Sequence, residues 1–254
     1  METVSVYRKK YTVGINDVDF TKKLKLSALF GYFQDVASFA VENLHIGIDV
    51  LTSKFSVSWV LVRIRVDIDR IPSWNEEITV ETWPQEPGKL EFERDYAVLD
   101  KEGQVIIRAV SSWVLFDIHT REPRRSDLIA FHFPPFIKDR AIECKLSKLK
   151  PPGEAEIAYK KVIGYSDVEL NGHINNSKYI DFIMDCFSVE KHRQYDVKTI
   201  EVNYVNEAMP GETLMMRRGI SALEAGRIYI DGVNVNNEKT VFRAQLEIVA
   251  KEQE

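Results

Sequence analysis

His173 and Glu207 are side chains of the type that can move protons, and Asn171 lies two residues before the histidine. Histidine has an unperturbed pKa of about 6.5, so it can exchange a proton near neutral pH. His173 lies directly ahead of a segment with helical periodicity, and Glu207 lies in the turn after an expected strand at 198–205. This pattern suits an acid–base site beside a helix N-terminus, whose free amides can hold a developing oxyanion.

The same residues also suit a purely structural role. The segment from Asn171 to Asn176 reads Asn-Gly-His-Ile-Asn-Asn, and such pairs are common in turns and at helix N-caps. A lone histidine before a helix is most often a polar loop residue, and Glu207 alone is compatible with a solvated carboxylate. Residue types and spacing therefore leave both interpretations open.

The positions of these residues follow from an internal repeat. Gly14–Thr21 returns as Gly164–Asn171, an offset of 150 residues, and both copies continue into an apolar segment of helical period. Further on, Val62–Val66 aligns with Ile200–Tyr204 at an offset of 138. The smaller offset indicates that the second copy lacks most of the connection around 46–58.

Each copy is predicted to hold one long helix followed by about four antiparallel strands. Apolar and charged residues alternate along 62–69, which is typical of a sheet with one wet face. One helix covered by a curved antiparallel sheet is an α+β layer of the hot-dog type, so two copies predict a double hot dog. We expect an N-terminal half at 1–118, a proline-containing linker at 119–155 and a C-terminal half at 156–254.

The two copies differ where the chemistry would be. Thr21 and Lys23 occupy the positions of Asn171 and His173, so an Asn/His site exists in the second copy alone. We therefore expect the C-terminal half to be catalytic and the N-terminal half to enclose a substrate.

Composition excludes several classes of protein. The chain has 254 residues, a formal net charge of −5 and 44% hydrophobic residues, without an apolar run of the roughly 18 residues that a membrane span needs. The N-terminal residues resemble neither a secretion signal nor a transit peptide. Mild acidity argues against nucleic acid as a partner, and Cys144 and Cys186 provide no disulfide framework or metal-ligand spacing. We expect a cytoplasmic protein without metal or cofactor; a homodimer stays open.

The segment Asp167–Tyr179 resembles the active-site segment of the acyl-acyl-carrier-protein (acyl-ACP) thioesterases, which are double hot-dog enzymes. Ile71–Trp83, Ser112–Leu115 and Thr199–Glu207 also have close counterparts in that family. The resemblance implies a site of Glu169, Asn171, His173 and Glu207, with the glutamate 34 residues beyond the histidine. Plant members usually have Asp where Glu169 stands, and often Cys where this chain has Ala208, so an acyl-cysteine intermediate is not expected.

The resemblance implies hydrolysis of fatty acyl-ACP to free fatty acid and holo-ACP, which terminates fatty acid synthesis. Glu207, with or without His173, would be the general base for a water molecule, Asn171 would position the water or the carbonyl, and Glu169 would orient the segment. Backbone amides around Asn175 and Asn176 are the candidate oxyanion site. The alternatives are an acyl-CoA thioesterase and a non-catalytic acyl-binding hot-dog protein.

Two further sets of residues are predicted to contact substrate or carrier. Leu29, Phe33 and Trp59 would line the acyl chain in the N-terminal half. Residues 119–161 hold ten Lys+Arg and six Asp+Glu, so this stretch is basic although the chain is acidic. The acidic carrier protein would dock there, and a merely solvated linker is the alternative. The candidate docking residues are Arg121, Arg124, Arg125, Lys145, Lys148 and Lys150.

Overall fold

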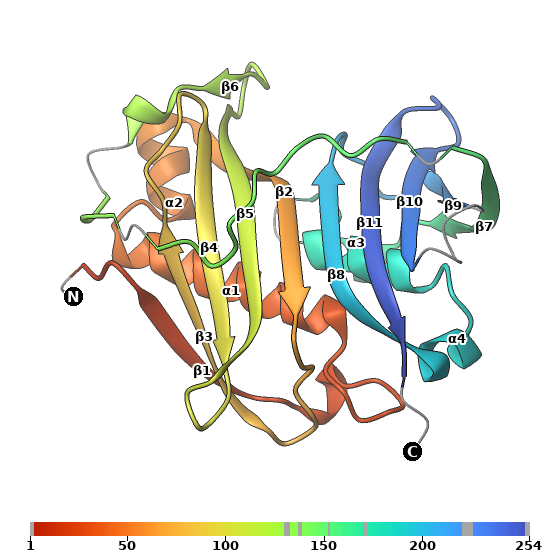
Figure 1. The fold of residues 1–254 in the computed structure, drawn as a ribbon. Helices are drawn as coiled ribbons and strands as arrows, with labels where there is room; N and C mark the ends of the chain where they lie inside the picture. Colours follow the sequence, from red (N-terminus) through yellow and green to blue (C-terminus); the bar gives the residue numbers. More distant parts are fainter. Residues whose placement is uncertain are drawn as a thin grey trace. The chain divides into compact units, whose positions relative to one another are not determined.

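The computed structural model describes residues 3–129, 133–136, 139–151, 153–169, 172–219 and 226–251 (Figure 1). The chain forms two compact units, the first of residues 1–25 and 31–146 and the second of 26–30 and 147–254. Asn171, a predicted site residue, lies outside the described residues. Within the described part of the chain, none of the helices has the length and apolar character that crossing a membrane requires.

The first unit is an antiparallel sheet with a long helix on one face (Figure 1). Helix α1 (Leu26–Asn43) belongs to this unit from Gly31 onward. Its apolar face is buried as the periodicity predicts, and Leu29 and Phe33 are almost fully inaccessible. The strands, in sheet order, are β1 (Tyr7–Thr12), β3 (Glu77–Pro84), β4 (Glu91–Leu99), β5 (Val105–Asp117) and β2 (Val57–Ile68), with β6 (Pro123–Arg124) on β5. Short helical turns are η1 (Ile15–Asp17), α2 (Ile48–Val50), η2 (Leu51–Phe55) and η3 (Ser126–Leu128).

The second unit repeats this plan with a shorter helix. Helix α3 (Asn176–Met184) is followed by α4 (Val189–Gln194) and preceded by the 3-10 turn η5 (Tyr165–Asp167). The strands, in sheet order, are β8 (Tyr195–Tyr204), β11 (Thr240–Ala250), β10 (Arg227–Asn234), β9 (Thr213–Gly219) and β7 (Ala155–Val162), all antiparallel. Each unit is thus one main helix on an antiparallel sheet, as the repeat predicts.

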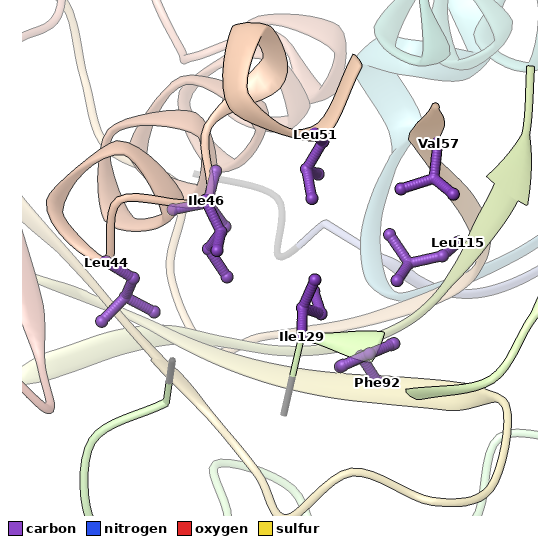
Figure 2. Close-up of a cluster of buried hydrophobic side chains, with 8 residues drawn as sticks. Leu44, Ile46, Leu51, Val57, Phe92, Leu115 and Ile129 are labelled. Carbon is purple, nitrogen blue, oxygen red and sulfur yellow. The ribbon is translucent and has the colours of Figure 1, made fainter. Parts of the chain in front are cut away.

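A cluster of buried apolar side chains lies around the C-terminal end of α1 in the first unit (Figure 2). Its side chains converge from α1, the α2–η2 segment, three strands and the residue after η3. Burial of one such side chain is worth about 1.5–3 kcal/mol, so this cluster is a main source of stability. Its members are Val41, Leu44, Ile46, Leu51, Val57, Phe92, Leu115 and Ile129.

Backbone hydrogen bonds show that the predicted alignment of the two copies is wrong in its second part, which was placed at an offset of 138. Asn75 donates its N–H to the Val13 carbonyl, and Gly211 donates to Ile163, so these residues are equivalent at an offset of 136 rather than 138. Both have positive φ, 64° for Asn75 and 86° for Gly211. Strand sequences have a period of two, so a shift by two residues preserves the apolar pattern and sequence cannot detect it.

The shorter length of the second copy also has a different origin from the one predicted. Helix α1 has 18 residues and α3 has nine. The connection from α1 to β2 spans 44–56, and that from α3 to β8 spans 185–194. Most of the missing length is therefore helix, because α3 ends at Met184 and its chain turns into α4.

Arg140 ties the segment after the first unit's strands to the outer face of β4. Its guanidinium lies 3.0 Å from Asp95 and 2.7 Å from Glu93, and Asp95 is completely buried. Burial raises the pKa of Asp95 to about 6, against the opposing effect of the Arg140 charge. The predicted linker is thus held to the sheet at this point by a titratable contact.

We expect Asp95 to make the unfolding free energy rise as the pH falls from 7 towards 4. The folded state binds this proton more tightly than the unfolded chain, whose Asp pKa is about 3.9, so the change is at most about 3 kcal/mol. Asp95→Asn should lack this contribution, and the exposed Asp127→Asn should keep it. Urea unfolding at pH 7.5 and pH 5 measures the difference; equal pH responses of wild type and Asp95→Asn would contradict it.

Candidate active site

A tight hydrogen-bonded turn presents His173. Gly172 donates its N–H to the Glu169 carbonyl (2.9 Å), and Glu169 donates to the His173 carbonyl (2.8 Å). Val168 and Ile174 pair across the turn, and Gly172 has a φ of 77°. Glycine adopts this left-handed conformation without steric cost, which is why Asn-Gly suits the turn. The backbone therefore fixes where the histidine side chain leaves the chain.

Helix α3 begins directly after this turn, with Asn175 as its N-cap. The Asn175 side-chain oxygen accepts hydrogen bonds from Ser177 N (2.9 Å) and Ser177 Oγ (2.8 Å). The Asn175 amide donates to the Asp167 carbonyl, and the Lys178 amide donates to the Asn175 carbonyl. The amides of Asn175, Ser177 and Lys178 are thus occupied, whereas no acceptor is found among the described residues for the amide of Asn176. The predicted oxyanion position thus narrows to Asn176.

Glu207 lies in the loop after β8, and hydrogen bonds hold that loop on both sides. The amides of Val205 and Asn206 donate to the Val241 carbonyl, and the Met209 amide donates to the Glu212 side chain. Ala208 is buried, and its methyl group anchors the loop beside the carboxylate. Glu207 itself is 45% exposed.

The structure brings His173 and Glu207 together. His173 Nδ1 lies 3.7 Å from Glu207 Oε2, a distance beyond that of a hydrogen bond but within that of an ion pair. Nδ1 is buried and has no hydrogen-bond partner among the described residues. The imidazole is 30% exposed. A carboxylate beside one ring nitrogen can orient the ring, so this pair can serve acid–base chemistry.

The first unit has the same turn without these two side chains. Lys22 donates to the Asp19 carbonyl, Asp19 donates to Lys23, and Lys22 has a φ of 62°. Lys23 occupies the position of His173 and donates its Nζ to Ser73 Oγ (3.0 Å). At the corrected offset of 136, Ile71 occupies the position of Glu207. Neither member of the pair is therefore present in the first copy.

Tyr179, on the buried face of α3, is a neighbour of the site. It is 5% exposed, and its ring packs against Tyr204 and Phe242. Burial raises the pKa of Tyr179, the Glu207 charge raises it further, and a hydrogen bond with the Ala208 backbone opposes both. The Tyr179 hydroxyl thus lies within electrostatic range of the Glu207 carboxylate. The helical period of the sequence alone could not reveal this proximity.

The three residues predicted to line the acyl chain differ in their surroundings. Leu29 is fully buried in the first turn of α1, which groups with the second unit, whereas Phe33 packs on Tyr96 in the first unit at a centroid distance of 4.8 Å. Trp59 packs edge-on against Phe92 in the apolar cluster.

The predicted docking residues fall into two sets. Arg124 and Arg125 are exposed and form ion pairs with Asp117 and Asp127, and Arg121 is also exposed. The other set is exposed and flanks the buried Leu146 and Leu149; it consists of Lys145, Lys148 and Lys150. Within the described residues, no group of three or more His, Cys, Asp or Glu side chains is placed to hold a metal ion.

Solved structures share this fold along nearly the whole chain. An acyl-ACP thioesterase from Bacteroides thetaiotaomicron is 24% identical, with a TM-score of 0.85 over 96% of this chain and 98% of the other. The 12:0-ACP thioesterase from Umbellularia californica is 21% identical, with a TM-score of 0.82 over 98% of each chain. The predicted double hot dog is thereby confirmed.

Family models then identify the chain more closely. The acyl-ACP thioesterase N-terminal domain matches residues 4–128, and the C-terminal domain of the same family matches residues 151–253. The chain belongs to the acyl-ACP thioesterase family, which confirms the resemblance seen in the sequence.

Curated relatives include two from Arabidopsis thaliana. Oleoyl-acyl carrier protein thioesterase 2 is 27% identical over 223 residues, which are 82% of this chain and 61% of the relative. A palmitoyl-acyl carrier protein thioesterase is 23% identical over 242 residues, which are 89% of this chain and 58% of the relative. The chain thus spans about three-fifths of the length of these relatives.

We expect Gly172→Ala to destabilise the protein by about 1 kcal/mol, because alanine at a positive φ is strained. Steric overlap would not cause this destabilisation, since a Cβ at Gly172 would meet no atom within 4 Å. Gly153 has the same open surroundings without a left-handed φ, so Gly153→Ala is the matched control. Thermal unfolding measures both; equal losses would show that the turn at Gly172 carries no conformational constraint.

Proposed function

We propose that this protein hydrolyses fatty acyl-ACP thioesters to free fatty acid and holo-ACP. The proposal rests chiefly on the pair of His173 and Glu207, whose Nδ1 and Oε2 atoms are 3.7 Å apart within a member of the acyl-ACP thioesterase family. The names of the curated relatives support the same reaction, since they are oleoyl- and palmitoyl-acyl carrier protein thioesterases.

In the proposed mechanism, a water molecule attacks the thioester carbonyl with general-base assistance from Glu207, alone or together with His173. The carbonyl oxygen gains negative charge, which the Asn176 amide at the start of α3 would stabilise. Asn171 would position the water or the carbonyl, and Glu169 would orient the turn through its hydrogen bonds with Gly172 and His173. The leaving thiolate takes a proton from the protonated base. Ala208 supplies no thiol, so no acyl-cysteine intermediate forms.

The acyl chain would lie against the N-terminal half, along Phe33 and Trp59. Enclosure of an apolar chain is worth about 0.8 kcal/mol per methylene, so the depth of this enclosure would set the preferred chain length. The burial of Phe33 and the packing of Trp59 on the apolar cluster support this placement.

The lysines at 145, 148 and 150 are the stronger candidates for carrier docking. Leu149 donates its amide to Asn203 Oδ1 (2.7 Å) and accepts a hydrogen bond from Arg243 Nη1 (3.3 Å), so the backbone between these lysines is held in place. The lysine side chains themselves are exposed and have no ion-pair partner among the described residues. Arg124 and Arg125 are less suitable, because each is already paired with an aspartate.

An acyl-CoA thioesterase would use the same chemistry with a different carrier, and a non-catalytic acyl-binding protein would release no thiol. A thiol-release assay across acyl chain lengths on both ACP and CoA separates these three functions.

We also retain the predictions of a cytoplasmic location and of catalysis confined to residues 156–254.

We expect His173→Ala, Asn171→Ala and Glu207→Ala each to lower kcat by about 10²–10⁴-fold, the usual worth of general acid–base assistance. The partial exposure of His173 and Glu207 means that the fold should survive, which thermal unfolding checks. Lys23→Ala alters the equivalent position of the first copy and should leave kcat unchanged. An unaltered rate in Glu207→Ala would remove Glu207 from the mechanism.

Charge reversal of the lysines should weaken carrier binding. The triple variant of Lys145, Lys148 and Lys150 to Glu should raise KM for acyl-ACP about fivefold at low salt, since exposed charge pairs contribute about 0.2–1 kcal/mol each. The effect should shrink as salt screens the charges. Lys239→Glu, which reverses an exposed lysine in the turn before β11, is the control. A KM that does not respond to either the triple variant or salt would leave these lysines as solvated linker residues.

A further inference from the structure

A cluster of buried polar side chains lies in the first unit, on the sheet face that α1 covers. We name it the inner polar cluster; its members are Thr82, Arg94, Tyr96, Ser111 and Trp113. Arg94 is 6% exposed, and Thr82, Tyr96 and Ser111 are 1% or less. They come from three neighbouring strands, where Thr82 pairs with Tyr96 and Arg94 pairs with Ser111.

The guanidinium of Arg94 is poorly matched within this cluster. Its Nη1 donates to Thr82 Oγ1 (3.2 Å), and among the described residues no carboxylate lies within ion-pair distance of it. The neighbouring acids Glu93 and Asp95 project to the opposite face, where both contact Arg140. Burial lowers the pKa of Arg94, which reflects the cost of its unpaired charge. Among the described residues, Thr82 Oγ1 is thus the side-chain acceptor of this guanidinium, and it is a neutral hydroxyl rather than a carboxylate.

The rest of the cluster is also rich in donors. Trp113 donates its indole N–H to Ser111 Oγ (2.7 Å), and Ser111 Oγ lies 3.4 Å from the Tyr96 hydroxyl. The Thr82 hydroxyl is used, since it donates to the Asp95 carbonyl (2.9 Å). The Ser111 hydroxyl is used as well, since it lies 3.3 Å from the Arg94 carbonyl. The guanidinium and the Tyr96 hydroxyl are therefore the donors of this cluster that could meet an oxygen acceptor.

The second unit shows that this face does not require polar residues. There the equivalent ladder of strands β10 and β11 pairs Ile228 with Leu246 and Ile230 with Ala244. In the first unit Arg94 pairs with Ser111 and Tyr96 with Ala109, so Ile228, Leu246 and Ile230 replace Arg94, Ser111 and Tyr96. All three are fully buried. At these three positions the same fold is thus built with apolar side chains, although Arg218, which pairs with Ile230, occupies the position of Thr82. The fold therefore does not require Arg94, Tyr96 and Ser111 where they stand, and burying them is a cost.

The cluster adjoins the residues assigned to the acyl chain. Phe33 of α1 packs on the Tyr96 ring, and Trp113 pairs in the sheet with Phe92 of the apolar cluster. Trp59 packs on Phe92, and its indole N–H is buried without a partner among the described residues. The residues assigned to the acyl chain are therefore direct neighbours of the inner polar cluster.

We infer that the inner polar cluster binds an oxygen substituent of the acyl chain, a hydroxyl, carbonyl or carboxylate, with Arg94 as the principal donor. This inference rests on the proposed function and adds its substrate class: oxygen-bearing acyl thioesters in preference to plain alkyl ones. The ligand's oxygen would give the Arg94 guanidinium an acceptor in addition to Thr82, whereas a plain alkyl chain offers it none. Tyr96 supports the site through its hydroxyl.

The test compares thiol release from dodecanoyl-ACP with release from C12 acyl-ACPs that carry a hydroxyl at carbon 3, 7 or 12, or a carboxylate at carbon 12. We expect the wild type to prefer at least one oxygenated substrate in kcat/KM. Arg94→Met should reduce that preference about tenfold or more, because a charge-assisted hydrogen bond is lost. It should leave the rate on dodecanoyl-ACP equal or higher, a result that misfolding cannot produce.

Two further variants sharpen this test. Tyr96→Phe removes only a hydroxyl and should reduce the preference less than Arg94→Met does. Arg108→Met alters an exposed arginine of β5 that is paired with Asp69, and it should leave the preference unchanged. A wild type without any preference, or a preference that survives Arg94→Met, would overturn the inference.

Binding separates this inference from the proposed function. Thermal stabilisation by 12-hydroxydodecanoate, dodecanedioate and dodecanoate reports the site without catalysis. Failure to release thiol from any acyl thioester rejects the proposed hydrolysis. In that case, stronger stabilisation by an oxygenated acid that is lost in Arg94→Met still supports the polar site, and equal stabilisation by all three acids rejects it.

Discussion

A short set of backbone hydrogen bonds determines how the chain approaches each main helix, and the proposed site depends on it. In the second unit Glu169 and His173 close the turn, and the Asn175 amide is held by the Asp167 carbonyl. In the first unit Asp19 and Lys23 close the turn, and the Lys25 amide is held by Asp17. Main-chain groups make these bonds, so they place whatever side chain follows the turn. The position of His173 beside the Glu207 loop follows from this geometry.

Because the backbone frame is shared, the two copies can diverge in chemistry without a change of fold. The second copy carries His173 and Glu207 where the first has Lys23 and Ile71. The first copy carries Arg94, Tyr96 and Ser111 where the second has Ile228, Ile230 and Leu246. At these equivalent positions the two units thus carry side chains of different chemical type. Burying such groups costs free energy, which agrees with the proposal that a substrate meets them.

Much of the fold was predictable from the chain itself. The period of the apolar residues indicated one helix and several strands per copy, and the similarity of the copies indicated two units. The strand alignment was wrong by two residues because alternation looks the same after such a shift. The length of α3 was also missed, since apolar residues such as Cys186 and Phe187 continue beyond its end at Met184. Apolar periodicity does not show where tertiary contacts stop a helix.

By itself, the sequence determined the double hot-dog class, the family and the candidate residues His173 and Glu207. These follow from local patterns and from a motif of adjacent residues. Only the tertiary structure decided that the two side chains lie 3.7 Å apart, that the Tyr179 hydroxyl lies within electrostatic range of Glu207 and that Arg94 is buried without a carboxylate partner. Such facts depend on which residues from distant strands share a face. Strand register sets that, and the register arises from packing across the whole sheet rather than from neighbours along the chain.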